Sequence, residues 1–310
     1  MKLVVPLVLL AALAGCSLLE RARSNFWELE RGSSDQAPDP ATTREPVIQV
    51  YAARTVGWRG FFAVHTWISV KPRDAEAYTR YEVIGWGVDR GAPALRVNRS
   101  GPDNYWFGDR PELLVDLRGD AADPLVARVE AAVASYPYPA SYRTWPGPNS
   151  NTFTAWVGRS VPELRLKLPP TAIGKDFLPG SVADTTPSGT GLQLSLFGLT
   201  GLAVGWEEGI EVNLLTLNFG LEVKPPALKL PMIGRIGPSG RRHDAEHQST
   251  QISGRVDPEK QSDPSRDVTG AGLYRRPMVW YVRAILDREA IHGRPGARSR
   301  RQGRNRHGRQ

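Results

Sequence analysis

The chain contains one cysteine, Cys16, among 310 residues. It can therefore form no intrachain disulfide bond, so its fold must be held by buried apolar surface and hydrogen bonds. Hydrophobic residues make up 40% of the sequence, and nine residues are tryptophan. A chain of this size and apolar content is long enough to build a hydrophobic core.

The N-terminal residues are typical of an export signal. Met1 and Lys2 precede an apolar run at residues 3–13, which is shorter than the roughly 20 residues that span a bilayer as a helix. Leu13-Ala14-Gly15-Cys16 resembles the lipobox of bacterial lipoproteins. The resemblance implies cleavage before Cys16 and acylation of it, which would anchor the chain to the periplasmic side of the outer membrane or otherwise to the inner membrane. The alternative is a plain signal peptide, or a short anchor helix, that ends in cysteine.

The excess positive charge is confined to the C-terminal part of the chain. Residues 235–310 hold 17 Lys and Arg against 8 Asp and Glu, whereas the net charge of the whole chain is +8. The rest is therefore nearly neutral, and we expect no nucleic-acid partner. The arginines at residues 298–309 suit contact with anionic lipid head groups; the alternative is a solvated tail without a partner.

Composition divides the chain into four parts. We expect a signal peptide at residues 1–15, a lipidated tether at 16–45, a folded domain at 46–237 and a basic, mostly disordered tail at 238–310. One short amphipathic helix is expected within the tail, at residues 278–291.

The folded domain has the pattern of an α+β protein with a small antiparallel sheet and packed helices. Period-2 alternation and β-branched residues predict strands at 47–52, 61–71, 79–86 and 95–99. Asp123-Pro124 begins one predicted helix, and a second follows at 151–160. Apolar runs at 189–205 and 210–223, punctuated by glycine, predict an added β-hairpin whose turn is Trp206-Glu207-Glu208-Gly209.

Two features of this domain suit chemistry. His65 is the only histidine in residues 46–237; it is either a general base or a core histidine with one hydrogen bond. Asn149 and Ser150 follow a Pro-Gly-Pro segment at the start of the second helix, and a helix N-terminus stabilises developing negative charge. The alternative is that Asn149 or Ser150 simply caps the helix.

This order of residues resembles that of circularly permuted papain-like hydrolases and acyltransferases, such as the NlpC-related peptidases and the lecithin retinol acyltransferase group. The resemblance implies a general base at His65, a nucleophile at Ser150 beside Asn149, and an orienting group for which Glu82 is the candidate. Serine stands where those families have cysteine, and serine is the weaker nucleophile near neutral pH. The chain is thus expected to be either a non-catalytic envelope lipoprotein or an envelope hydrolase or acyltransferase. No metal or other cofactor is expected.

Five longer strings of the folded domain are distinctive: Phe62-Ala63-Val64-His65-Thr66-Trp67, Tyr81-Glu82-Val83-Ile84-Gly85-Trp86-Gly87, Arg110-Pro111-Glu112-Leu113-Leu114, residues 142–153 and residues 169–176. They resemble a bacterial family catalogued as domain of unknown function 3750, over residues 36–237. That family has no assigned activity, so the resemblance implies kinship without a mechanism.

Overall fold

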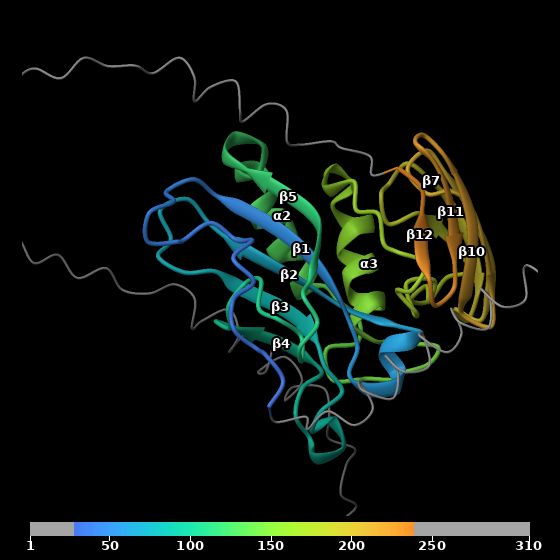
Figure 1. The fold of residues 1–310 in the computed structure, drawn as a ribbon, viewed down its shortest axis with the longest axis horizontal. Coiled ribbons are helices and arrows are strands. Elements are labelled where there is room, and N and C mark those ends of the chain that lie inside the picture. The colour runs from blue at the N-terminus through green and yellow to red at the C-terminus, as the bar shows by residue number, and fades with distance from the viewer. Residues whose placement is uncertain (1–27, 239–310) are drawn as a thin grey trace, which may run out of the picture. The chain divides into compact units, whose positions relative to one another are not determined.

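The computed structural model describes residues 28–238, which hold two antiparallel β-sheets and two α-helices (Figure 1). The predicted α+β class, with an antiparallel sheet and packed helices, is confirmed. The predictions for Cys16, the signal peptide, residues 16–27 of the tether and the basic tail, including its helix at 278–291, lie outside the described residues.

The first sheet has five strands in the order β4-β3-β2-β1-β5. Four of them match predicted strands, and the fifth, β5, was not predicted because its short run mixes apolar and charged residues. The second predicted strand begins later than expected, because residues 57–61 form a 3-10 helix. The bounds are β1 (Val47–Arg54), η1 (Gly57–Phe61), β2 (Val64–Lys71), β3 (Thr79–Val83), η2 (Val88–Arg90), β4 (Leu95–Asn98), β5 (Glu112–Arg118) and η3 (Gly119–Ala121).

Both faces of this sheet are buried, because β1 and β2 carry large side chains on each side. Ile48, Val50 and Ile68 belong to the main core, together with residues of helices α2 (Asp123–Ala134) and α3 (Ser150–Ser160). Trp67 and Tyr51 belong to a second, aromatic cluster on the opposite face. The alternation of side chains along a strand sends neighbouring residues of β2 to these two different environments.

Residues 28–45 differ from the predicted extended tether. Ser34 is buried, and its hydroxyl donates a hydrogen bond to the Asp103 carbonyl (2.7 Å). The backbone amide of Gln36 donates to the Asp103 carboxylate (2.6 Å). These polar groups find partners on the body of the protein, so the segment packs against it instead of remaining solvated.

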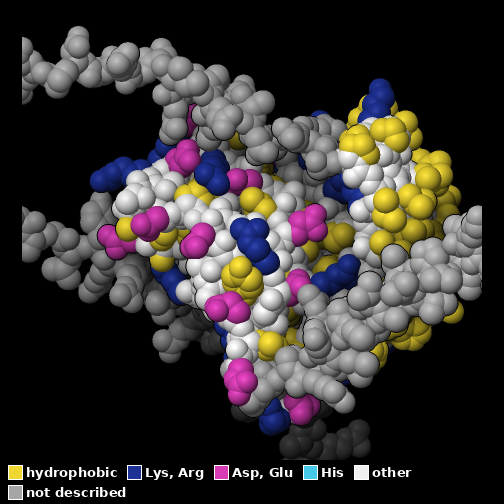
Figure 2. Space-filling model, in the orientation of Figure 1, with side chains coloured by type: hydrophobic (Ala, Val, Ile, Leu, Met, Phe, Trp, Pro, Cys, Tyr) yellow, Lys and Arg dark blue, Asp and Glu magenta, His cyan; other side chains and the backbone are white. Residues whose placement is uncertain are grey.

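The second sheet is a seven-stranded antiparallel meander in the order β12-β11-β10-β9-β8-β7-β6. Hydrophobic side chains gather over this sheet, at the right of Figure 2. After the 3-10 helix η4 (Pro162–Leu164), its strands are β6 (Ala183–Thr185), β7 (Gly191–Leu196), β8 (Thr200–Gly205), β9 (Gly209–Leu214), β10 (Leu217–Val223), β11 (Pro226–Leu230) and β12 (Gly234–Ile236).

The prediction of a single β-hairpin here was wrong. Each predicted strand is itself a pair of strands, divided by tight turns at Phe197-Gly198 and at Leu215-Thr216. Leu215 and Thr216 both have positive φ (52° and 69°), although neither residue type is a turn signal. The predicted turn at residues 206–209 does lie between β8 and β9. Within residues 28–238, no helix is long and apolar enough to cross a membrane.

Candidate functional site

The structure brings two of the four candidate residues together. Trp67 on β2 lies directly opposite Glu82 on β3, so His65, two residues before Trp67, shares a face with Glu82. His65 Nε2 lies 3.0 Å from Glu82 Oε2. Arg80 Nη2 donates to the same oxygen (2.8 Å), and Asn98 Nδ2 donates to Glu82 Oε1 (3.0 Å).

The charges in this cluster are fixed by burial and pairing. Burial alone would raise the pKa of Glu82, but the hydrogen bond from His65 and the charge of Arg80 outweigh it and lower the pKa to about 2. Burial lowers the pKa of His65, and Glu82 offsets this only in part. At neutral pH the cluster therefore consists of a neutral imidazole whose Nε2–H donates to a carboxylate, which is paired with the Arg80 guanidinium.

Aromatic rings cover the His65 imidazole. Its ring stacks on Trp106 with centroids 3.9 Å apart, and Trp106 stacks in turn on Trp86 at 5.7 Å. On the same side of the sheet, the Arg80 guanidinium lies 4.1 Å from the Trp67 ring. His65 is 5% exposed, whereas Trp86 is 53% exposed. The stack thus shields the histidine, while Trp106 is partly exposed and Trp86, the outermost ring, is more exposed.

Asn149 caps helix α3, as one of the two sequence interpretations expected. Its Oδ1 accepts hydrogen bonds from the amides of Asn151 (2.9 Å) and Thr152 (3.2 Å), and Thr152 Oγ1 accepts from the Asn149 amide, which completes a capping box. Asn149 Nδ2 donates to the carbonyls of Thr144 and Ile173. The side chain is therefore fully engaged in holding the helix start.

Ser150 lies against the opposite face of the sheet from His65. Its carbonyl accepts a hydrogen bond from Thr66 Oγ1 (3.2 Å), and Thr66 Oγ1 also contacts Asn151 and Thr154 of the same helix. Because Thr66 points toward α3, its neighbour His65 points away from α3. The structure therefore joins His65 to Glu82 and Asn149 to the start of α3, but it does not bring Ser150 to His65.

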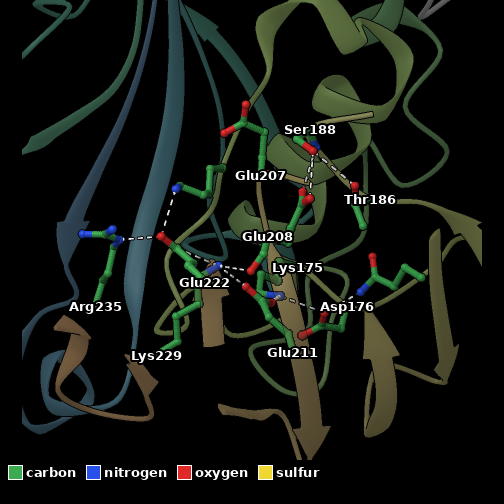
Figure 3. Close-up of polar contacts among 12 residues, drawn as sticks. Lys175, Asp176, Thr186, Ser188, Glu207, Glu208, Glu211, Glu222, Lys229 and Arg235 are labelled. Carbon is green, nitrogen blue, oxygen red and sulfur yellow. Dashed lines mark hydrogen bonds and ion pairs between the residues drawn. The ribbon is translucent and has the colours of Figure 1, made fainter. Parts of the chain in front are cut away.

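A second polar cluster, which sequence reasoning missed, lies on the buried face of the seven-stranded sheet (Figure 3). Glu211 is its centre: it pairs with Lys175 (2.6 Å) and with Lys229. Lys229 also pairs with Glu222 (3.0 Å), and Lys175 with Asp176 (3.0 Å). Glu222 accepts further from Arg235 (2.7 Å) and Lys167 (3.2 Å).

Pairing keeps this cluster charged despite its burial. Burial raises the pKa of the Glu211 carboxyl, but the ammonium groups of Lys175 and Lys229 lower it by more. The cluster contains paired charges of both signs, which is the pattern of a structural network. No group of three or more His, Cys, Asp or Glu residues in the described part of the chain is placed to hold a metal ion. A local sequence signal for this cluster does exist. Polar residues alternate with apolar ones along β7 (Gln193, Ser195) and β9 (Glu211, Asn213), which places them on one face of the sheet.

Acid should remove the stabilisation that comes from Glu82. The folded pKa of about 2 lies below the ordinary value of 4.5, so this contribution, about 3 kcal/mol, is present above pH 4.5 and is lost as the pH falls toward 2. The pKa of His65 is also lowered in the folded protein, so the free energy of unfolding also decreases as the pH falls below 6.5. Urea unfolding from pH 7 to pH 3 should show the gap between the wild type and Glu82→Gln shrinking with acid. A gap that stays constant would contradict the assignment.

Residues 45–177 match a family described as Protein of unknown function (DUF3750). This range contains the five-stranded sheet, α2 and α3, with His65, Glu82, Asn149 and Ser150. The predicted resemblance is therefore confirmed for these residues, but the match ends before the seven-stranded sheet. Neither a curated protein nor a solved structure matches the chain.

Proposed function

We propose that this chain is a lipid-anchored protein of the cell envelope that acts by binding and not by catalysis at His65 and Ser150. The observation that supports this most directly is the placement of those two residues against opposite faces of β2. A general base must come within about 3 Å of the proton it takes, directly or through one water. Here the sheet separates the two groups, and Glu82 and Trp106 already engage the imidazole.

The proposed site of membrane anchoring is Cys16, the lipobox cysteine. The described residues begin at Glu28, and residues 17–27 separate it in sequence from Cys16. Twelve residue steps reach about 40 Å when fully extended, which would hold the folded body close to the bilayer. The periplasmic side of the outer membrane, or otherwise the inner membrane, is the expected location.

Replacing Cys16 by serine tests the anchor. We expect Cys16→Ser to abolish incorporation of labelled palmitate and to lower the amount of protein that stays with membranes after a high-salt wash, because no thiol remains to be acylated. Ser24→Ala, in the same segment, should change neither readout. Unchanged palmitate labelling of Cys16→Ser would refute the anchor.

The alternative function is an envelope hydrolase or acyltransferase that uses Ser150 with His65. It requires the two side chains to converge and predicts that a fluorophosphonate probe labels Ser150, with loss of labelling in His65→Ala. We expect no labelling of Ser150 in the wild type, because His65 lies on the other face of the sheet from the serine. Mass spectrometry of the probe-treated chain measures whether Ser150 is labelled. Labelling that is lost in His65→Ala would support the hydrolase or acyltransferase.

A further inference from the structure

The seven-stranded sheet has an outer face made of apolar side chains in register. Six residues, one from each of β7 to β12, lie in a single cross-strand row: Leu192, Val204, Ile210, Leu221, Leu228 and Ile236. A second row lies beside it and consists of Leu194, Leu202, Val212 and Phe219. We call these ten residues the apolar face. All ten are exposed, and Leu192 reaches 72%.

The usual distribution of polarity is inverted in this sheet. Along β9 the outward residues are Ile210, Val212 and Leu214, and the buried residues between them are Glu211 and Asn213. In β7 to β11, all of which lie within the described residues, no outward position holds a charged side chain. The inward side is occupied by the ion-pair network of Glu211 and Lys229, so the apolar side chains have no core to enter.

The turns at one end of the sheet extend this apolar surface. Because the strands form a meander, the turns after β7, β9 and β11 lie at the same end. They carry Phe197, Leu215 and Ile233, which are 76%, 70% and 60% exposed. At the other end, Trp206 is exposed and the Lys224 ammonium lies 5.1 Å from its ring, a pairing typical of a membrane–water interface.

We propose that the apolar face binds the surface of a lipid bilayer. Six strands at a spacing of about 4.8 Å and a strand length of about 20 Å give a patch of the order of 500 Å² in projection. The largest apolar patch of a soluble monomer is typically about 300–600 Å² and is often a binding site for protein or membrane. The inference rests on the proposed anchoring, which would already hold this face within reach of lipid.

Charge favours a bilayer over the other occupants. Residues 239–310 follow directly after β12 and hold 16 Lys and Arg against 8 Asp and Glu, so this segment is attracted to anionic head groups. Two copies joined face to face would bring two such segments together, and the like charge of these segments opposes that pairing.

Vesicle binding of the full chain tests the proposal. In the Cys16→Ser background, which has no acyl chain, we expect the protein to sediment with vesicles of phosphatidylethanolamine and phosphatidylglycerol. The triple variant Leu194→Thr, Val212→Thr, Phe219→Thr should bind at least tenfold more weakly, because three apolar contacts with lipid are lost. The matched control is Val97→Thr, an exposed valine on the five-stranded sheet, and it should bind as the parent does.

The other outcomes are equally informative. A triple variant that binds vesicles as tightly as its parent overturns the proposal. A parent that is a dimer in sedimentation equilibrium, and a triple variant that is a monomer, also overturn it, because a second copy would then cover the face. A parent that binds vesicles only after truncation following Pro238 overturns it as well, because the chain itself would then cover the face. If the triple variant fails to fold, Leu192→Thr with Ile210→Thr repeats the test on the other row. Loss of palmitate labelling concerns Cys16 alone, so the anchor and the face can fail separately.

Discussion

Replacing Glu211 by alanine is expected to lower the free energy of unfolding by about 3–5 kcal/mol. Glu211 pairs with both Lys175 and Lys229, and all three side chains are almost completely buried. Removing the carboxylate leaves two ammonium groups in the interior with reduced compensation, and each is costly to desolvate. Urea unfolding at neutral pH, followed by tryptophan fluorescence, measures the change.

The matched control for Glu211 is an ion pair at the surface. Arg128 Nη1 lies 2.5 Å from Glu163 Oε1, and both side chains are about half exposed. Such surface pairs contribute at most about 1 kcal/mol to the free energy of unfolding. Glu163→Ala should therefore change the free energy of unfolding by no more than that. If Glu211→Ala costs no more than Glu163→Ala, the buried network is not a stabilising part of the fold.

Replacing Trp67 by alanine is expected to cost about 3–5 kcal/mol of unfolding free energy. The indole is completely buried, stacks on Tyr51 with centroids 5.5 Å apart, and donates from Nε1 to the Pro102 carbonyl (2.7 Å). Its removal opens a cavity beside the Arg80 guanidinium, which lies over the ring. Trp67→Phe should cost less, because it keeps most of the packing and loses chiefly the hydrogen bond.

Trp58 provides the control for this substitution, because its side chain is 65% exposed. Trp58→Ala should change the unfolding free energy by less than about 1 kcal/mol, and thermal unfolding of the two variants side by side gives the comparison. Equal losses from the two substitutions would show that the aromatic cluster on the His65 face contributes little to stability.

The five-stranded sheet and α3 were largely predictable because their signals are local. Alternation along residues 61–71 predicted a strand, in which the neighbours His65 and Thr66 necessarily lie on opposite faces. The polar residues at 149–151 predicted a helix start. Which face α3 would cover was not predictable, because long-range packing decides it. The pairing of His65 with Glu82 likewise depends on the register of β2 against β3, which one sequence does not fix.

The seven-stranded sheet was harder to predict for two physical reasons. The turn at Leu215-Thr216 uses positive φ values without glycine or asparagine, so nothing local marked it as a turn. The partners of the buried charges come from distant parts of the chain: Lys175 and Glu211 are 36 residues apart. Alternation along β9 separates Glu211 from Ile210 and Val212, but the pairing that turns the charge inward is set by these distant partners.

The outward orientation of the apolar face can be tested directly by labelling single cysteines. Because Cys16 is the only cysteine, Cys16→Ser gives a thiol-free background. Leu194→Cys then probes the outer face, Gln193→Cys the buried face of the same strand, and Val97→Cys the other sheet. The measurement is the rate of labelling by a water-soluble maleimide, with and without vesicles.

Without lipid, we expect Leu194→Cys to react quickly and Gln193→Cys slowly. Vesicles should slow the reaction of Leu194→Cys about tenfold, because the thiol then lies against lipid where the reagent and the thiolate are both disfavoured, and should leave Val97→Cys unchanged. The outward orientation is contradicted if Leu194→Cys reacts as slowly as Gln193→Cys in buffer, and binding of the apolar face to lipid is contradicted if vesicles do not alter the rate of Leu194→Cys.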